Sequence, residues 1–149
     1  MRFHLIDRIE AYEPGRSVRA RKVTSLSEEY WSSNAHGTIM PAPLVLEFLC
    51  QAGSWLIMLT TERRKRAALL QVASVAFLAD VHPGDVLEAT GFVESMSDEM
   101  AVLSGSVSVD GHEVLTATDI MCALIDGGDL EDLGDTLRMQ QVLTLAAGT

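Results

Sequence analysis

A long and nearly uninterrupted apolar run occupies residues 39–59 of the chain. Wound as a helix, this run is hydrophobic on nearly every face, which is typical of a helix buried inside a domain. Pro41 and Pro43 suit the first helical turn, because a backbone N–H there would have no intrahelical partner. The pattern therefore predicts a buried helix that begins between Pro41 and Pro43 and ends between Thr61 and Arg66.

Outside this run, apolar and polar positions alternate, which is typical of half-buried strands. The alternation predicts six strands, over residues 3–10, 16–25, 69–78, 86–95, 100–109 and 112–125. Asp110 and Gly111 are a strong signal for a hairpin between the last two strands. Residues 13–15 and 82–85 are typical of turns, and residues 26–38 are typical of a polar loop.

A long helix with two strands before it and a four-strand antiparallel meander after it leaves few ways to bury the helix. The sheet must wrap around it, which predicts an α+β, hot-dog fold: a curved antiparallel sheet around one long central helix. We expect a single domain over residues 1–125, then an acidic extension over residues 126–149 with one short helix near 130–143. Because one copy leaves a strand edge unpaired, we expect a homodimer or a higher even oligomer.

The composition is that of a globular domain, with 48% apolar residues in 149. The net charge of −10 argues against nucleic acid as a partner. The N-terminus does not resemble a secretory signal, and Glu47 and Gln51 within the apolar run argue against a membrane span. Cys50 and Cys122 lack metal-ligand spacing, and we expect both to be reduced thiols in a cytoplasmic protein. We expect neither a metal ion nor a cofactor.

Glu47 is the carboxylate within the apolar helix, and Gln51 follows it four residues later on the same helical face. A carboxyl group in an apolar pocket tends to stay protonated and can then donate a proton. The pair is therefore a candidate general acid with an orienting amide. The alternative is a buried polar pair within a hydrogen-bond network of the core or of a dimer interface.

Two further candidates lie at the start of this helix. Backbone N–H groups at a helix N-terminus favour a thioester oxygen or another partial negative charge. Pro43 contributes no donor, whereas Ala42 and Leu44 could each contribute one. The alternative is an ordinary capped or solvated helix start. His36 lies in the loop just before the helix and is a candidate base for a nearby acid, unless it is a loop histidine without a role.

Several segments resemble the 3-hydroxyacyl-acyl carrier protein dehydratases of the FabA/FabZ type. The resemblance covers roughly residues 3–125. The matching segments are residues 3–9, 13–15, 30–31, 39–41, 46–52, 83–85 and 121–123. The Met-Pro and Glu pattern at the helix, combined with the Pro-Gly-Asp turn, is the most specific part of the resemblance.

The resemblance implies a hot-dog dimer with its sites between the subunits. A histidine of one chain and the helix acid of the other would remove water from a (3R)-hydroxyacyl thioester in fatty acid or related lipid or polyketide synthesis. By the resemblance, Glu47 takes the acid position and Gln51 matches the helix glutamine. Ala42 takes a position, usually glycine, whose N–H faces the thioester carbonyl, and Gly37 joins the substrate-binding residues.

The chain departs from the family pattern at the catalytic histidine. The family histidine lies in a Gly-His-Phe-Pro-Gly segment, at the position of Ser33, or of Asn34 if one deletion is allowed, and His36 comes two or three residues later. Three interpretations stay open. The first is a dehydratase that uses His36 and Glu47. The others are a non-catalytic acyl-binding homologue, such as the partner subunit of an active dehydratase in a heterodimer, and a hot-dog thioesterase in which Glu47 activates water.

Eight of the eleven basic residues lie in two short patches. The first patch is Arg16, Arg19, Arg21 and Lys22; the second is Arg63, Arg64, Lys65 and Arg66. Because the resemblance implies an acidic carrier protein as partner, we expect one patch, and foremost the second, to dock it. The alternative is that the second patch simply solvates the C-terminal end of the helix, where cations suit the helix dipole.

Overall fold

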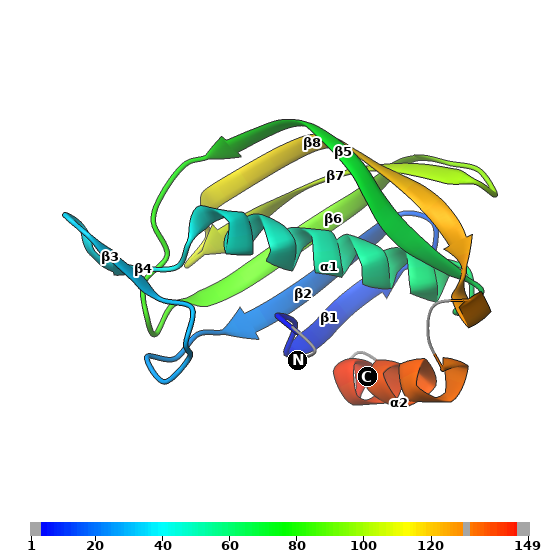
Figure 1. Cartoon of the computed structure of the whole chain (residues 1–149), viewed down its shortest axis with the longest axis horizontal. Coiled ribbons are helices and arrows are strands. Elements are labelled where there is room, and N and C mark those ends of the chain that lie inside the picture. The colour runs from blue at the N-terminus through cyan, green and yellow to red at the C-terminus, as the bar shows by residue number, and fades with distance from the viewer. Residues whose placement is uncertain (1–3, 130–131, 146–149) are drawn as a thin grey trace.

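The computed structural model describes residues 4–129 and 132–145. Its elements are β1 (Arg8–Glu13), β2 (Ser17–Val23), β3 (Ser32–Asn34), β4 (Gly37–Ile39), α1 (Ala42–Thr60), β5 (Lys65–Phe77), β6 (Val86–Met96), β7 (Met100–Val109), β8 (His112–Asp126), the 3-10 helix η1 (Gly127–Asp129) and α2 (Leu133–Thr144). Six strands form one antiparallel sheet in the order β1-β2-β6-β7-β8-β5, which curves around α1 (Figure 1). The predicted α+β class, with one long helix packed against a curved antiparallel sheet, is confirmed.

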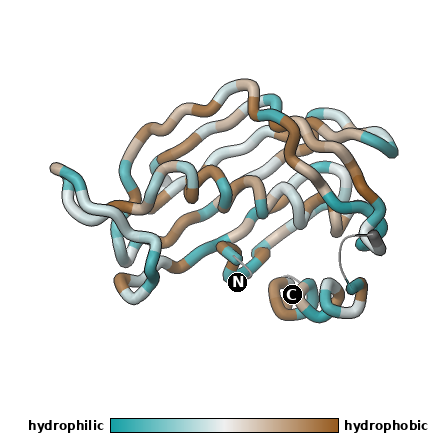
Figure 2. The backbone as a smooth tube through the Cα atoms, viewed as in Figure 1, coloured by the Kyte–Doolittle hydropathy of each residue, from teal (hydrophilic) through white to brown (hydrophobic). Residues whose placement is uncertain are grey.

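The core lies between α1 and the concave face of the sheet. The helix residues buried there are Val45, Phe48, Leu49, Ala52, Trp55, Leu56, Ile57, Met58 and Leu59. By length and composition α1 could cross a membrane, but half of it is buried inside the fold, as expected of a core helix. Hydrophobic residues recur along α1 and alternate with polar ones along the strands (Figure 2). Burial of these side chains is the main force that holds the helix in the curved sheet.

The curvature of the sheet comes from irregular strand pairing and from one very close approach. Register shifts occur in β5 between Leu69 and Gln71, in β6 between Val93 and Ser95, and in β7 between Leu103 and Gly105. Such bulges bend a strand and increase its twist. At Gly105 a Cβ would lie 2.4 Å from the Thr90 carbonyl oxygen and 2.8 Å from Leu49 Cδ1. Glycine therefore lets the sheet approach both its neighbouring strand and the helix.

The strand order corrects one prediction. The four strands after the helix do not form a single meander, because β5 pairs with β8 at the edge of the sheet and β6 pairs with β2. Tight connections join β6 to β7 and β7 to β8, whereas residues 78–85 are long enough to cross between distant strands. This crossing is held by Val81, which accepts the Met40 N–H at 2.8 Å, and by Asp85, which accepts the Thr24 N–H at 3.1 Å.

Two short strands were not predicted. The 26–38 segment, expected to be a loop, contains the β3–β4 hairpin, which projects beyond the start of α1 (Figure 1). The first predicted strand is displaced: β1 spans Arg8–Glu13 instead of residues 3–10, of which residue 3 lies outside the described part of the chain.

The two edges of the sheet, β1 and β5, have different surroundings. Helix α2 packs beside β1 and buries Thr136 and Leu143 (Figure 1). Strand β5 forms the opposite edge and leaves several large apolar side chains exposed. These are Leu69 (52%), Leu70 (60%) and Phe77 (49%). Long apolar edges of this kind favour pairing with another chain.

Candidate active site

Glu47 lies in the second turn of α1, on the side of the helix that the sheet does not enclose. The sequence predicted that the sheet would bury this helix on most sides. Instead, a row of half-buried side chains leads along one side of it. They are Glu47, Cys50, Gln51 and Ser54. The carboxyl group is thus partly accessible, which suits a reacting group better than a residue enclosed in the core.

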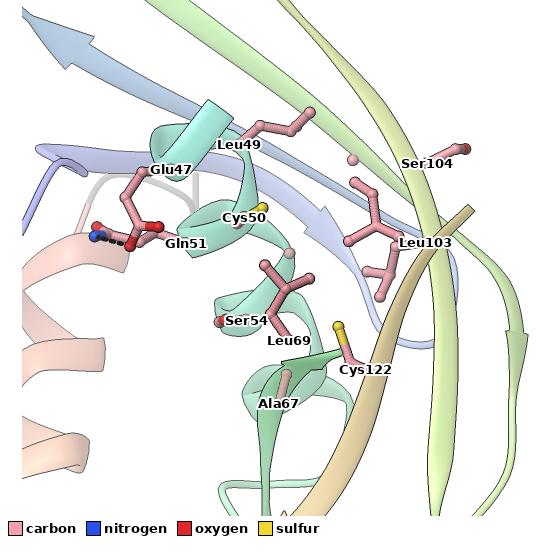
Figure 3. A pocket seen from close by; sticks show the side chains of 13 residues that line it. Glu47, Leu49, Cys50, Gln51, Ser54, Ala67, Leu69, Leu103, Ser104 and Cys122 are labelled. Atoms are coloured by element: carbon pink, nitrogen blue, oxygen red, sulfur yellow. Dashed lines mark hydrogen bonds between the residues drawn. The ribbon is translucent and has the colours of Figure 1, made fainter. Parts of the chain in front are cut away.

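A short chain of hydrogen bonds orients the Glu47 carboxyl group. Gln51 Nε2 donates to Glu47 Oε1 at 3.0 Å (Figure 3). Gln51 Oε1 accepts the backbone N–H of Leu5 at 2.9 Å. The Leu5 N–H can only donate, so it selects the amide orientation in which Nε2 faces Glu47. Oε1 of Glu47 therefore receives a hydrogen bond from the same helix, which fixes the orientation of the carboxyl group.

An apolar cavity of about 190 Å³ extends from Glu47 between α1 and the sheet. Leu103, Ile120 and Cys122 line it from the strands, and Cys50 and Gly53 line it from the helix. Figure 3 shows Leu103 and Cys122 across the cavity from α1. Apolar cavities with a few convergent polar groups are the usual form of a small-molecule site. This one is suited to a hydrocarbon chain whose polar end lies beside Glu47.

The two cysteines of the cavity are free thiols. Burial raises the pKa of Cys50 to about 11, and the nearby Glu47 and Cys122 add to this effect. Burial likewise raises the pKa of Cys122. Because the thiolate is the reactive form of cysteine, neither side chain is a nucleophile near neutral pH. Among the residues that line this cavity, Glu47 is the one that carries a carboxyl group.

The structure does not bring His36 to Glu47 within one chain. His36 is an exposed residue at the tip of the β3–β4 hairpin, where its backbone N–H donates to Asn34 Oδ1 at 2.7 Å. Gly37 follows with φ +104°, a conformation that favours glycine. Among the described residues, neither His36 nor Gly37 lines the cavity at Glu47. A site that combines His36 with Glu47 therefore needs a second copy of the chain.

Ala42 lies at the start of α1 and lines a second cavity of about 260 Å³. Pro41 is the N-cap and makes no side-chain capping bond. Pro43 has no N–H, and the Leu44 N–H donates to the Pro41 carbonyl at 2.9 Å, so Ala42 carries the N–H that could serve a ligand here. Apolar side chains of Val45, Phe77 and Leu78 form the walls of this cavity. Ala42 and Glu47 are thus placed at successive points along the same helix.

The basic segment that was expected to dock a carrier protein has mostly intramolecular partners. Arg66 is 6% exposed and donates to Thr136 at 2.5 Å, so it holds α2 in place and does not face outward. Arg63 donates to Gln140 at 2.9 Å, and Lys65 forms an ion pair with Asp126 at 2.8 Å. Arg64 is the exposed member of this segment. In the first patch Lys22 is buried, whereas Arg16, Arg19 and Arg21 are exposed, so the docking prediction rests on Arg64 and on these three arginines.

Sequence reasoning missed the residues that complete the site. The Leu5 N–H carries no sequence signal, because every residue except proline has the same donor. Leu103 and Ile120 follow the strand alternation, which predicts that they face the core but not that they border a cavity. In residues 4–129 and 132–145, no three His, Cys, Asp or Glu residues are grouped so that they could hold a metal ion.

Comparison with known proteins places the chain in a family. The profile of the FabA-like domain matches residues 1–118. The chain belongs to the FabA-like family. This FabA-like protein is 32% identical over 115 residues to a 3-hydroxyacyl-[acyl-carrier-protein] dehydratase FabZ of Latilactobacillus sakei. The aligned region covers 76% of this chain and 82% of the relative. The FabZ of Nitratidesulfovibrio vulgaris is 31% identical over 127 residues, or 83% and 81% of the two chains.

Solved structures agree on the fold of this FabA-like protein. A Streptococcus mutans protein bound to acetyl CoA superposes with a TM-score of 0.67 and 19% identity, over 85% of this chain and 94% of that one. A hypothetical thioesterase of Streptococcus pneumoniae with coenzyme A gives a TM-score of 0.61 and 21% identity, over 80% and 86% of the two chains. The predicted hot-dog fold is thus confirmed. Helix α2 lies beyond the residues that the family profile matches.

Proposed function

We propose that this FabA-like protein is a cytoplasmic 3-hydroxyacyl-[acyl-carrier-protein] dehydratase that serves fatty acid or related lipid or polyketide synthesis. The observation that carries the proposal is the oriented Glu47 carboxyl group at the entrance of an apolar cavity. The FabZ dehydratases among its relatives support the same reaction. The acyl chain would occupy the cavity, and C3 of the substrate would lie beside Glu47.

In this mechanism a base removes the proton from C2 of the hydroxyacyl thioester, and Glu47 protonates the departing C3 hydroxyl group. The C2–H electron pair becomes the C2–C3 double bond, the C3–O bond breaks, and water leaves. The Ala42 N–H at the start of α1 would stabilise the charge that develops on the thioester oxygen. His36 of a second copy is the base in this proposal.

The proposed active form is a homodimer, because three features of one chain are incomplete alone. Glu47 lies on the open side of α1, and β5 is an apolar edge without a neighbour on its outer side among the described residues. The β3–β4 hairpin, which carries His36 between its strands, projects beyond the start of α1 (Figure 1). Pairing two copies would cover the first two features and allow each hairpin to reach the other copy.

Mixing two inactive variants tests whether each site is shared between two chains. Glu47→Gln and His36→Ala are each expected to be inactive as homodimers. After joint refolding, a heterodimer would hold one intact site, with Glu47 from one chain and His36 from the other, so statistical pairing predicts about a quarter of wild-type turnover. The assay is mass spectrometry of the 3-hydroxyacyl thioester on carrier protein. If the refolded mixture is no more active than the two variants assayed separately, the site is not shared between two chains.

A second candidate function is that of a non-catalytic acyl-binding partner of an active dehydratase. The exposed hairpin position of His36 and the Asn34 beside it favour this alternative. The same assay separates the possibilities for the wild-type chain. An enoyl thioester indicates a dehydratase, an unchanged but bound thioester indicates a binding partner, and a free carrier thiol indicates a thioesterase.

The size of the cavity leads to a prediction about chain length. Gly53 lines the cavity, and a Cβ there would meet Leu103 Cδ2 at 3.4 Å, an ordinary contact. Gly53→Leu should fill the cavity and lower turnover of an eight-carbon substrate at least about tenfold, while a four-carbon substrate is spared, since each excluded methylene loses about 0.8 kcal/mol of burial. Gly53→Ala is the control and should keep both rates. Equal loss for both chain lengths would show that the acyl chain does not enter this cavity.

A further inference from the structure

A buried lysine occupies the inner face of β2, where the alternation calls for an apolar side chain. Val18, Ala20 and Lys22 are the inward residues of this strand, and the Lys22 side chain is only 4% exposed. An ammonium group withdrawn from water is strongly destabilising unless it is paired. Apolar packing alone therefore does not account for Lys22.

The loop that follows β2 supplies the partner. Lys22 Nζ lies 2.8 Å from Glu28 Oε1 and 5.7 Å from the centre of the Tyr30 ring. The Tyr30 hydroxyl donates to the other carboxylate oxygen, Glu28 Oε2. Burial works to raise the pKa of Glu28, but the hydrogen bonds from Lys22 and Tyr30 hold it below its usual value. Glu28 thus stays ionised near neutral pH and ties strand, loop and ring together.

This cluster lies directly before the β3–β4 hairpin. The rings of Tyr30 and Trp31 are 5.0 Å apart, and Trp31 Nε1 donates to the Ser25 carbonyl at 2.8 Å. Ser32, the next residue, begins β3. At the other end of the hairpin, Met40 is 2% exposed and donates its N–H to Val81 at 2.8 Å. Both ends of the hairpin are therefore fixed to the body of the protein, one of them through Lys22.

We propose that Lys22, Glu28 and Tyr30 are positioning residues that set the direction of the β3–β4 hairpin and so deliver His36 to the Glu47 site of a second copy. This inference rests on the proposed dehydratase function. An apolar contact would tolerate sliding of the loop, whereas a buried charge pair with a second hydrogen bond has one favourable geometry. The cluster thus gives the hairpin a defined position, at a cost in the stability of the fold.

The test compares Lys22→Met, Lys22→Arg and Tyr30→Phe in the full chain, by hydrogen exchange of residues 32–39 and by dehydration kinetics. Lys22→Met should speed exchange in the hairpin about tenfold or more, and should leave β6 and β7 unchanged. Its kcat should fall about tenfold with KM changed less than about twofold, because the base is misplaced while the acyl cavity is intact. Lys22→Arg should restore most of the rate, and Tyr30→Phe should be intermediate.

Ile57→Ala is the matched control for lost stability. Ile57 is fully buried near the end of α1 opposite the hairpin and does not line the cavity at Glu47. The Ile57→Ala substitution should lower the melting temperature and leave both hydrogen exchange in the hairpin and kcat near their wild-type values. Unchanged hairpin exchange in Lys22→Met, or an equal fall of kcat in Ile57→Ala, would overturn the inference. If the wild-type chain removes no water, the proposed function fails, and the exchange comparison still decides whether the cluster fixes the hairpin.

Discussion

Replacement of Glu47 by glutamine is expected to lower kcat for dehydration by a factor of about 10²–10⁴, the usual contribution of a positioned acid. Glutamine has the same size and can still accept a hydrogen bond from Gln51 Nε2, so the fold and the cavity should be retained. Its amide protons are far too weakly acidic to be transferred to the departing hydroxyl group. The rate of enoyl thioester formation at saturating substrate measures the effect directly, with the melting temperature as a check on folding.

Ser54→Ala is the appropriate control for this change. Ser54 lines the same cavity and lies on the same open side of α1, two turns after Glu47. Its loss should change kcat by less than about threefold, since a surface or half-buried hydroxyl contributes little to a transition state that it does not touch. A Glu47→Gln enzyme with wild-type turnover would exclude Glu47 as the acid. Equal losses in the two variants would mean that disturbance of the cavity, not loss of the acid, stops the reaction.

Local patterns explain the parts of the fold that the sequence predicted. Helix α1 and strand β7 have nearly the predicted bounds, because each is set by the periodicity of its own residues. Asp110 and Gly111 adopt φ angles of +52° and +79°, as a tight hairpin between β7 and β8 requires. The hydrogen bond between Glu47 and Gln51 follows from their spacing on one helix.

Long-range packing explains the parts that it did not predict. The position of β5 beside β8 depends on a crossing segment whose anchors, Met40 and Thr24, are far away in sequence. The β3–β4 hairpin consists mostly of polar and small residues without alternation, so its sequence resembles that of a loop. Arg66 was expected at the surface because it is charged, but α2, some seventy residues later, covers it through Thr136.

The same distinction applies to the candidate site. Glu47 and Ala42 could be identified because their helix has a recognisable pattern. The open side of that helix could not be identified from the sequence, because it depends on where the edge of the sheet lies. That open side and the uncovered β5 edge lie close together in the fold, since Leu69 of β5 lines the cavity that begins at Glu47. Formation of the site and pairing of two copies are therefore expected to be one event.

The largest effect on assembly is expected from placing two lysines on the exposed edge strand. Leu70→Lys combined with Ala76→Lys replaces two side chains that are exposed in one chain and that line neither the cavity at Glu47 nor the cavity at Ala42. Charged lysines are a common natural means of blocking edge-to-edge strand pairing, and burying two of them in a dimer interface would be strongly unfavourable. The variant should be a folded monomer by light scattering. Its turnover should fall at least about a hundredfold, because no second hairpin reaches Glu47.

Leu133→Lys with Val142→Lys is the control, since these residues are also exposed but lie on α2, beside the opposite edge. That variant should remain a dimer with near wild-type turnover. Monomeric β5 lysine variants with full activity would show that a single chain holds a complete site and that His36 of a second copy is not the base. Loss of the dimer in the α2 control alone would place the interface at the β1 edge. Either result would require a different route for the proton that leaves C2.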